Sequence, residues 1–430
     1  MRVAIILLAA CGTKGNTNPG GPDAGSQRPP DGGDEVTPAG PLAGLPSPPG
    51  PHIAQIQALG NDAWLELGTP AADPMWGVAR GRSWGGRALV LAPGIRGAFF
   101  TGEGRHAFVK PDSHAMDDIF VYDINANAWI AVHPGTDIAT FNDRVASGDL
   151  HIDQNAQLVD HTDQPIPVHV LIHAWDFLAY DPDRDQFAMF ANDGLGRYFL
   201  GGEPEMDAGL DTLEAQRAAI TMPPMSPWFY DVSTARFQRQ RATNSAPLDY
   251  TSYSFFQYIA SKKQYVLAGR DAVGFYDLAS ATWITPTISG SSPPGYDHGG
   301  CYDAKRERLY LGPGSGSSET GLYVFDIATS TWSKPAVNGS APAGVGTNIA
   351  SIFCDSVNDV VLVFHYASRT RYVYDPTTNS WTSSPLPASV LDAVSYASFN
   401  AFFDPELNAY FLYAAGDSEE GGRMFAYRYR

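Results

Sequence analysis

The sequence predicts an all-β fold in which a four-stranded antiparallel unit is repeated around a closed ring. Three observations lead to this prediction. A short Asp-containing motif recurs along the chain, the composition favours strands and turns, and a strand-like segment near the N-terminus matches the strand that the last repeat lacks. Repetition with a period of about 20 to 50 residues is typical of solenoids and propellers.

The composition suits strands better than long helices. Of the 430 residues, 44% are hydrophobic, 12% are aromatic and only 17% are charged, with 43 Gly and 33 Pro. Such a chain can bury a large core, and its many turn-forming residues favour short strands. The net charge of −18 argues against nucleic-acid binding, which needs a basic surface, and against electrostatic docking on anionic lipid.

The first residues are typical of an export signal. Arg2 precedes a short apolar stretch at residues 3–10, and Leu8-Ala9-Ala10-Cys11 resembles the lipobox of bacterial lipoproteins. The resemblance implies that residues 1–11 are a signal peptide with Cys11 as the lipidated residue. Gly12 then implies sorting to the outer membrane of a Gram-negative bacterium. The alternative is an ordinary, truncated signal peptide that contains a Cys.

Residues 12–51 are mostly Gly, Pro, Ser, Thr and Asp. A segment so poor in large apolar side chains cannot bury a core, so we expect a disordered tether. Residues 52–430 form the predicted folded domain. No later stretch of about 18 apolar residues occurs, so we expect membrane attachment only through the lipid anchor.

The clearest repeat is an aromatic residue and an Asp, followed six positions after the Asp by a second aromatic residue. The intervening residues are turn formers, and an Asp side chain can accept hydrogen bonds from backbone N–H groups just ahead of it. Each copy is therefore a predicted hairpin. The copies are Tyr122-Asp123 to Trp129, Tyr230-Asp231 to Phe237, Tyr276-Asp277 to Trp283, Phe325-Asp326 to Trp332 and Tyr374-Asp375 to Trp381.

A second hairpin with the same spacing precedes each of the last four of these. Two successive hairpins give four antiparallel strands, which form one blade of a β-propeller. The second set comprises Tyr180-Asp181 to Phe187, Tyr302-Asp303 to Leu309, Cys354-Asp355 to Val361 and Phe403-Asp404 to Tyr410, while Tyr258-Ile259 to Tyr265 keeps the spacing without the Asp.

These motifs, with Gly269, Gly312 and Gly416 after second strands, resemble the Kelch repeat over roughly residues 55–430. The resemblance implies a Kelch-like β-propeller. It implies no particular activity, because this scaffold carries many unrelated functions.

The ends of the chain indicate six blades. The last repeat has three strands, and the segment around Trp64 resembles the strand around Trp129. An N-terminal strand that completes the last blade would close the ring and remove exposed edges. The 108 residues from Trp129 to Phe237 leave room for a seventh blade, which is the alternative. Six is preferred because that stretch holds one copy of each hairpin.

The short Asp hairpins should lie together on one face, here called the hairpin face. The remaining connections lie on the opposite, loop-rich face. The long ones are residues 102–118, 134–168 and 192–226, the last with a predicted helix at residues 210–220. Because loops on a rigid scaffold usually carry binding and catalysis, the loop-rich face over blades 1 and 2 is the predicted site.

Seven of the ten His residues lie between His106 and His173, in this sector. The alternative is that these His decorate solvated loops or are buried and hydrogen-bonded. The blade Trp residues and the hairpin Asp residues are predicted to be structural. The predicted binding residues are Glu103, Arg105, His106, His114, His169, His173, Trp175, Tyr253, Asp297 and His298.

No recognised catalytic or phosphate-binding motif occurs, and no positions match the copper site of galactose oxidase, which shares Kelch-like blades. We expect no metal and no cofactor. Cys301 and Cys354 are too few for a metal cage. They are interpreted as buried thiols on adjacent blades, with a disulfide in an oxidising compartment as the alternative.

The predicted function is that of a monomeric, exported binding protein that holds a glycan or a protein partner on the loop-rich face. The alternative is an enzyme that acts on extracellular polysaccharide at the same face. In that case Arg105, His106, His173 and His298 would be the acid–base or charge-stabilising groups.

Overall fold

The structure is a computed structural model. It describes residues 37–82, 89–102, 112–167, 176–190, 204–248, 255–270, 272–346, 349–391, 399–415 and 421–430. All of these belong to one compact unit, Asp34–Arg430. No helix in the described ranges is long and apolar enough to cross a bilayer.

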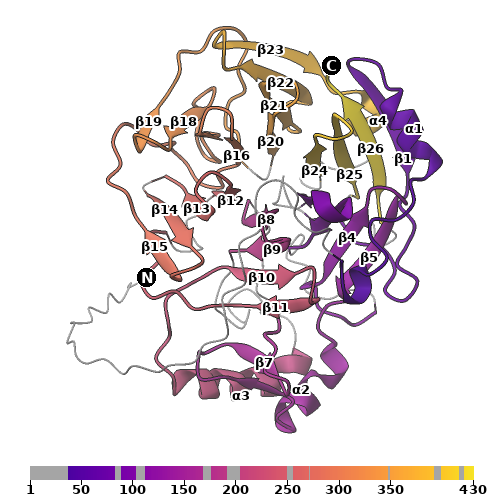
Figure 1. The fold of residues 1–430 in the computed structure, drawn as a ribbon, viewed down its shortest axis with the longest axis vertical. Coiled ribbons are helices and arrows are strands. Elements are labelled where there is room, and N and C mark those ends of the chain that lie inside the picture. The colour runs from indigo at the N-terminus through magenta and orange to yellow at the C-terminus, as the bar shows by residue number, and fades with distance from the viewer. Residues whose placement is uncertain are drawn as a thin grey trace. The chain divides into compact units, whose positions relative to one another are not determined.

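The fold is a six-bladed β-propeller, as predicted, with six four-stranded antiparallel sheets around a central axis (Figure 1). Blades 1 to 3 comprise β2 (Leu89–Ala92), β3 (Gly97–Phe100), β4 (Ile119–Asp123) and β5 (Ala128–His133); β8 (Leu178–Asp181), β9 (Gln186–Met189), β10 (Trp228–Asp231) and β11 (Arg236–Gln238); and β12 (Phe255–Ile259), β13 (Gln264–Ala268), β14 (Val273–Asp277) and β15 (Thr282–Ile284).

Blades 4 to 6 comprise β16 (Gly300–Asp303), β17 (Arg308–Leu311), β18 (Tyr323–Asp326) and β19 (Thr331–Ser333); β20 (Ala350–Asp355), β21 (Val360–His365), β22 (Thr370–Asp375) and β23 (Ser380–Pro385); and β24 (Phe399–Asp404), β25 (Ala409–Ala414), β26 (Arg423–Arg428) and β1 (Ala63–Gly68). The first strand of each blade in this order, from β2 to β24, is its innermost strand.

The N-terminal strand closes the ring, which confirms the prediction from Trp64. Strand β1 pairs with β26, with Trp64 opposite Tyr427, and the two rings lie 4.6 Å apart. The outer edge of blade 6 is therefore supplied by the start of the domain and the rest of the blade by its end. This closure gives blade 6 its fourth strand, so the edge of β26 is paired and not exposed.

The hairpins owe their uniformity to the predicted Asp. In β8–β9 the Asp181 carboxylate accepts hydrogen bonds from the backbone N–H groups of Asp183 and Arg184, at 2.9 and 3.2 Å. Four residues after the Asp position the backbone turns left-handed, as at Asp185 with φ of 51°. This conformation returns the chain in a fixed register, so the aromatic residue always falls six positions after the Asp.

The outermost strand of four blades is held by the connection that arrives from the neighbouring blade. In each case the backbone N–H of the blade Trp donates to that connection, at 2.7 or 2.8 Å. The pairs are Trp129 with Ala71 O, Trp283 with Asn244 Oδ1, Trp332 with Ser289 O, and Trp381 with Asn338 O. These Trp side chains are buried, as predicted. The hydrogen bonds of their backbone N–H groups connect each blade to the segment from the preceding blade.

The long connections of blades 1 and 2 build a module of their own. It consists of α2 (Ile138–Ala146), β6 (Leu150–Ile152), β7 (Leu158–Asp160), η3 (Pro204–Met206) and α3 (Asp207–Ala218). The module has a separate apolar core and lies beyond the outermost strand of blade 2 (Figure 1). Helix α3 confirms the helix predicted at residues 210–220. The described parts of these connections are thus packed elements rather than open loops.

The segment before β1 corrects the predicted limit of the tether. It contains η1 (Gly40–Leu42) and α1 (Pro51–Gln57), and Leu42 is fully buried. The backbone N–H of Ala39 donates to Val232 O at 2.9 Å, and that of Gly50 to Asn125 O at 2.8 Å. Residues 37–51 therefore belong to the folded domain, because a few apolar side chains and backbone hydrogen bonds suffice to hold them.

Two short elements complete the fold, η2 (Pro93–Ile95) and α4 (Ala388–Leu391).

The start of blade 1 is joined to blade 6 by a buried group of polar side chains. Arg82 forms an ion pair with Asp118 at 2.7 Å, with both side chains fully buried. The Asn400 amide pairs with the Arg82 backbone in both directions.

Candidate functional site

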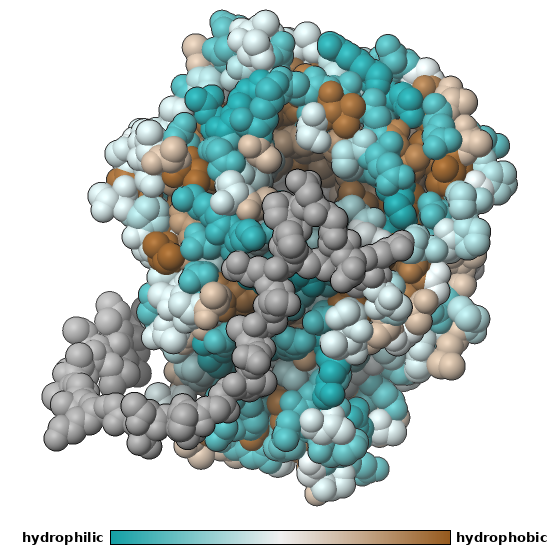
Figure 2. Space-filling view, in the orientation of Figure 1, coloured by the Kyte–Doolittle hydropathy of each residue, from teal (hydrophilic) through white to brown (hydrophobic). Residues whose placement is uncertain are grey.

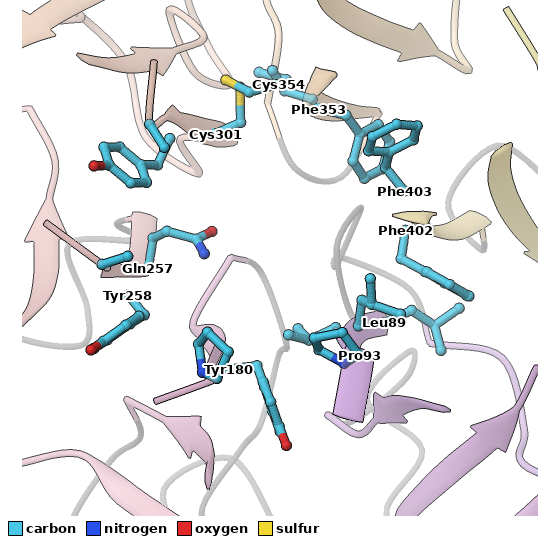
Figure 3. Close-up of a pocket in the computed structure, with 17 residues that line it drawn as sticks. Leu89, Pro93, Tyr180, Gln257, Tyr258, Cys301, Phe353, Cys354, Phe402 and Phe403 are labelled. Carbon is cyan, nitrogen blue, oxygen red and sulfur yellow. A yellow bond between two sulfur atoms is a disulfide. The ribbon is translucent and has the colours of Figure 1, made fainter. Parts of the chain in front are cut away.

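The innermost strands of all six blades enclose a cavity of about 360 Å³ at the hairpin end of the channel (Figure 3). Its position follows from its lining, because Pro93, Pro182 and Ala304 belong to the first hairpin of their blades. The lining residues are Leu89, Val90, Leu91, Pro93, Tyr180, Pro182, Gln257, Tyr258, Ala260, Cys301, Tyr302, Ala304, Ile352, Phe353, Cys354, Phe402 and Phe403.

None of these lining residues carries a charge. The three tyrosines direct their hydroxyls to carboxylates of the rim. Tyr258 donates to Asp183 at 2.5 Å, Tyr302 to Glu307 at 2.7 Å and Tyr180 to Asp185 at 3.2 Å. Burial raises the pKa of Tyr302 to about 12, and burial also raises the pKa values of Tyr180 and Tyr258. All three therefore stay protonated and neutral at physiological pH.

The hairpins around this cavity are linked by ion pairs. Arg306 bridges blades 4 and 5 by contacting Asp303 at 2.9 Å and Asp359 at 2.6 Å. Arg96 of blade 1 contacts Asp404 of blade 6 at 2.8 Å. Each pair neutralises charge locally and ties neighbouring hairpins together. These ion pairs therefore link neighbouring hairpins around the mouth of the cavity.

One polar group points into the cavity. Figure 3 shows the Gln257 amide directed toward the open centre, while Phe353, Phe402 and Phe403 form the wall on the other side. A mostly apolar cavity with a polar group that fixes orientation is the usual form of a small-molecule site. With neutral tyrosines and one amide, the described lining residues can bind and orient a ligand, but none of them would transfer a proton near neutral pH.

Cys301 and Cys354 form a disulfide in the cavity wall (Figure 3). This overturns the interpretation as two buried thiols and supports the alternative. The cysteines lie on β16 and β20, the innermost strands of blades 4 and 5, and their Cα atoms are 5.5 Å apart. That spacing is within the usual range for a disulfide.

Most of the predicted site residues lie outside the described part of the chain. These are Cys11, Glu103, Arg105, His106, His169, His173, Trp175 and Tyr253. Of the other three, His114 lies in the connection of blade 1, where its ring meets Trp76 edge-on at 5.4 Å. Asp297 and His298 lie at the start of blade 4. The described residues therefore place His114 in a different blade from the other two.

At the start of blade 4, Asp297 and His298 are both buried. His298 is fully buried, and its Nδ1 lies 3.1 Å from Gly312 O. Asp297 is 4% exposed and adopts a left-handed φ of 55°. Burial raises its pKa to about 6, although a hydrogen bond with Ser315 opposes the shift. His298 is thus buried with its ring beside a backbone carbonyl, and Asp297 is buried next to it.

Tyr296, the residue before Asp297, is 52% exposed. Gly316 lies directly beside its ring, since a Cβ there would come within 3.0 Å of Cε1. An exposed aromatic ring seated on a glycine can stack against a flat ligand. It was not among the predicted residues, because a single Tyr in a connection carries no repeat or motif that would indicate exposure.

The cavity residues were also missed by the sequence interpretation. Most of them lie at or next to the last two positions before the Asp of the first hairpin, or before the residue that replaces this Asp, Ala92 in blade 1 and Ile259 in blade 3. A signal was present: across the six blades these positions hold no charged residue, as in Val90-Leu91, Gln257-Tyr258 and Phe402-Phe403. Charge-free positions on every innermost strand indicate an apolar channel wall.

The rest of the described surface shows no large apolar patch. The large exposed apolar residues, such as Met75 and Val337, are scattered, and Figure 2 shows small, separate hydrophobic groups among hydrophilic residues on one face. The described ranges contain no group of three or more His, Cys, Asp or Glu residues arranged to hold a metal.

No protein-family profile and no curated protein matches this chain. Among solved structures it is similar to a chain of the mitotic checkpoint complex, with 12% identity, 100% of this chain and 98% of that chain covered, and a TM-score of 0.42. It is also similar to auxiliary nutrient binding proteins from Bacteroides thetaiotaomicron VPI-5482 (10% identity, 86% and 78% covered, TM-score 0.43) and Bacteroides ovatus ATCC 8483 (9%, 85% and 77%, TM-score 0.41).

Proposed function

We propose that this propeller is a binding protein that holds a small, neutral ligand in the channel cavity. The observation that carries the proposal is a cavity of about 360 Å³ built from all six blades, whose described lining residues are all uncharged. Its size is within the range of small-molecule sites. A charged ligand would lose its hydration without gaining a partner there, so a neutral ligand is favoured.

The lining also indicates the shape of the ligand. Aromatic rings of Phe353, Phe402 and Tyr258 surround the cavity, and such rings pack best against flat apolar faces. Gln257 supplies an amide, a group that can both donate and accept hydrogen bonds. The ligand class is therefore a ring-containing, mostly apolar molecule with at least one uncharged polar group.

Blocking the mouth should abolish binding. Ala304 is an exposed turn residue that lines the cavity, so Ala304→Trp should close the mouth without disturbing the core. We expect the affinity for N-phenyl-1-naphthylamine, a neutral fluorescent aromatic probe, to fall at least tenfold. Fluorescence titration measures this. The matched control is Ala279→Trp, at an exposed turn outside the cavity, which should bind as the original chain does. No binding by the original chain would overturn the proposal.

Export of the chain and lipidation at Cys11 remain part of the proposal. The Cys301–Cys354 disulfide supports export, because structural disulfides persist in oxidising compartments. Membrane fractionation of cells that express the chain, compared with Cys11→Ser, tests the anchor: retention of the Cys11→Ser chain in the membrane fraction would reject it.

A second candidate is glycan binding on the loop-rich face, which Tyr296 favours. Its exposed ring can stack on a sugar ring, and the sequence predicted a glycan or protein partner on this face. We expect a glycan-array hit with residues 37–430 to weaken at least tenfold in Tyr296→Ala and to persist in Tyr296→Phe. A hit that survives Tyr296→Ala would remove this residue from the site. The enzyme alternative has no described group of acid–base residues to support it.

A further inference from the structure

The disulfide is part of the cavity wall and not only a link between blades. Cys301 and Cys354 both line the cavity, and Figure 3 shows the sulfur–sulfur bond beside it, next to Phe353. The bond joins innermost strands of neighbouring blades across 53 residues of sequence. Any change in this bond therefore acts directly on the surface that a ligand would touch.

We propose that the cavity is redox-gated: the disulfide form binds the ligand, and the dithiol form binds it much more weakly. This inference rests on the proposed function and adds its regulation. Formation of the bond removes two electrons and two protons from the thiols, which pass to a disulfide donor in an oxidising compartment. Reduction by a dithiol reverses this and yields two thiols and an oxidised dithiol.

The packing around the sulfurs explains why reduction must reshape the cavity. Two unbonded thiols have to separate until they are in van der Waals contact rather than bonded. Cys301 is 5% exposed and packs in the apolar cluster that includes Tyr310, Val324 and Val361. Such interiors are close-packed and leave little room for movement. The cavity is the open space next to both sulfurs, so a thiol turns into it or β16 and β20 move apart.

Blades 4 and 5 keep other contacts when the bond is broken. Arg306 and Lys305 of blade 4 both contact Asp359 of blade 5, at 2.6 Å each, and the Tyr310 and Tyr374 rings lie 6.1 Å apart. These contacts hold the two blades together at the rim and behind the wall. Reduction is therefore expected to alter the cavity while the propeller stays folded.

Linkage makes the effect reciprocal. If reduction weakens ligand binding by a given factor, then bound ligand makes the disulfide harder to reduce by the same factor. For a two-electron couple, a tenfold change corresponds to about 30 mV. The consequence for the protein is that the binding site is completed only after oxidation. A chain still in a reducing cytoplasm would leave the ligand unbound.

The experiment titrates N-phenyl-1-naphthylamine against the oxidised chain, the chain reduced with dithiothreitol, and the Cys301→Ser/Cys354→Ser variant. We expect at least tenfold weaker binding in the last two. The control is Gly339→Ala, which is destabilised far from the cavity: a Cβ there would lie 2.3 Å from Trp381 O on the outer strand β23. Its affinity should equal that of the oxidised original chain.

Each outcome separates the two proposals. No binding by the oxidised chain overturns the proposed function, and equal affinity of the oxidised and reduced chains overturns the gate alone. Near-ultraviolet circular dichroism shows whether the reduced chain and the double variant are folded. If both are folded, the redox midpoint of the original chain is a second test: saturating probe should lower it by about 30 mV or more, and an unchanged midpoint rejects the gate. If both unfold, the gate is overturned, because it requires a folded dithiol form.

Discussion

Replacing Cys301 and Cys354 together with serine is expected to lower the free energy of unfolding by about 4 kcal/mol. The disulfide closes a loop that spans 53 residues, and a crosslink of that length removes much of the conformational freedom of the unfolded chain. Outside the cavity wall the folded state changes little, because the ion pairs of Arg306 still hold blades 4 and 5 together. The loss therefore arises mainly in the unfolded state.

Guanidinium denaturation followed by tryptophan fluorescence measures this loss. The double variant should show a lower midpoint and a steeper dependence on denaturant, because its unfolded chain is less compact. The control is the original chain in excess reductant, whose stability should match that of the variant in the same buffer. A difference below about 1 kcal/mol between oxidised chain and variant would contradict the entropic argument.

The architecture was predictable because its signals are local. An Asp at the head of most hairpins fixes the turn through hydrogen bonds from residues two and three positions ahead, as Asp375 does with Thr377 and Thr378. Such contacts are encoded within a few residues, so they recur visibly in the sequence. Closure of the ring by Trp64 was predictable for the same reason, since one strand of the repeat was missing at one end and present at the other.

The cavity and the disulfide depend on contacts between blades, which the repeat does not show directly. Cys301 stands two positions before Asp303, and Cys354 one position before Asp355. Because side chains alternate along a strand, these two positions point to opposite sides, one toward the next blade and the other toward the preceding one. Tyr258 follows the second pattern, since it reaches back to Asp183 of blade 2. The Cys301–Cys354 pairing could therefore have been predicted from the positions of the two cysteines on their strands. This prediction requires that blades 4 and 5 are already known to be neighbours in the propeller.

The predicted site on the loop-rich face is largely untested by the structure. Its expected residues lie mostly outside the described ranges, so Arg105, His106 and His173 stay predictions. The described parts of the same connections form the packed module with α2 and α3. Loop length alone suggested an open binding surface, whereas the apolar residues of these segments, such as Phe141 and Leu210, bury one another. The Kelch resemblance and the lipobox likewise stay predictions.

Asp297→Asn is expected to stabilise the protein by about 2 to 3 kcal/mol at pH 7.5 and by much less at pH 4. Burial raises the pKa of Asp297 from 3.8 in the unfolded chain to about 6 in the folded protein. Between these pH values the folded state binds more protons than the unfolded state. Stability contributed by the neutral carboxyl is therefore lost as the pH rises through this window, and above pH 6 the full cost of the buried charge remains.

Asparagine should remove that cost while it keeps the geometry. It tolerates the left-handed φ of 55°, and its amide oxygen can still accept a hydrogen bond from Ser315. Urea denaturation at pH 4 and pH 7.5 measures both stabilities. Asp297→Ala is the control: it also removes the charge, but alanine is strained at positive φ, so its gain at pH 7.5 should be smaller. An equal gain from Asp297→Asn at both pH values would show that the carboxyl does not titrate in this window.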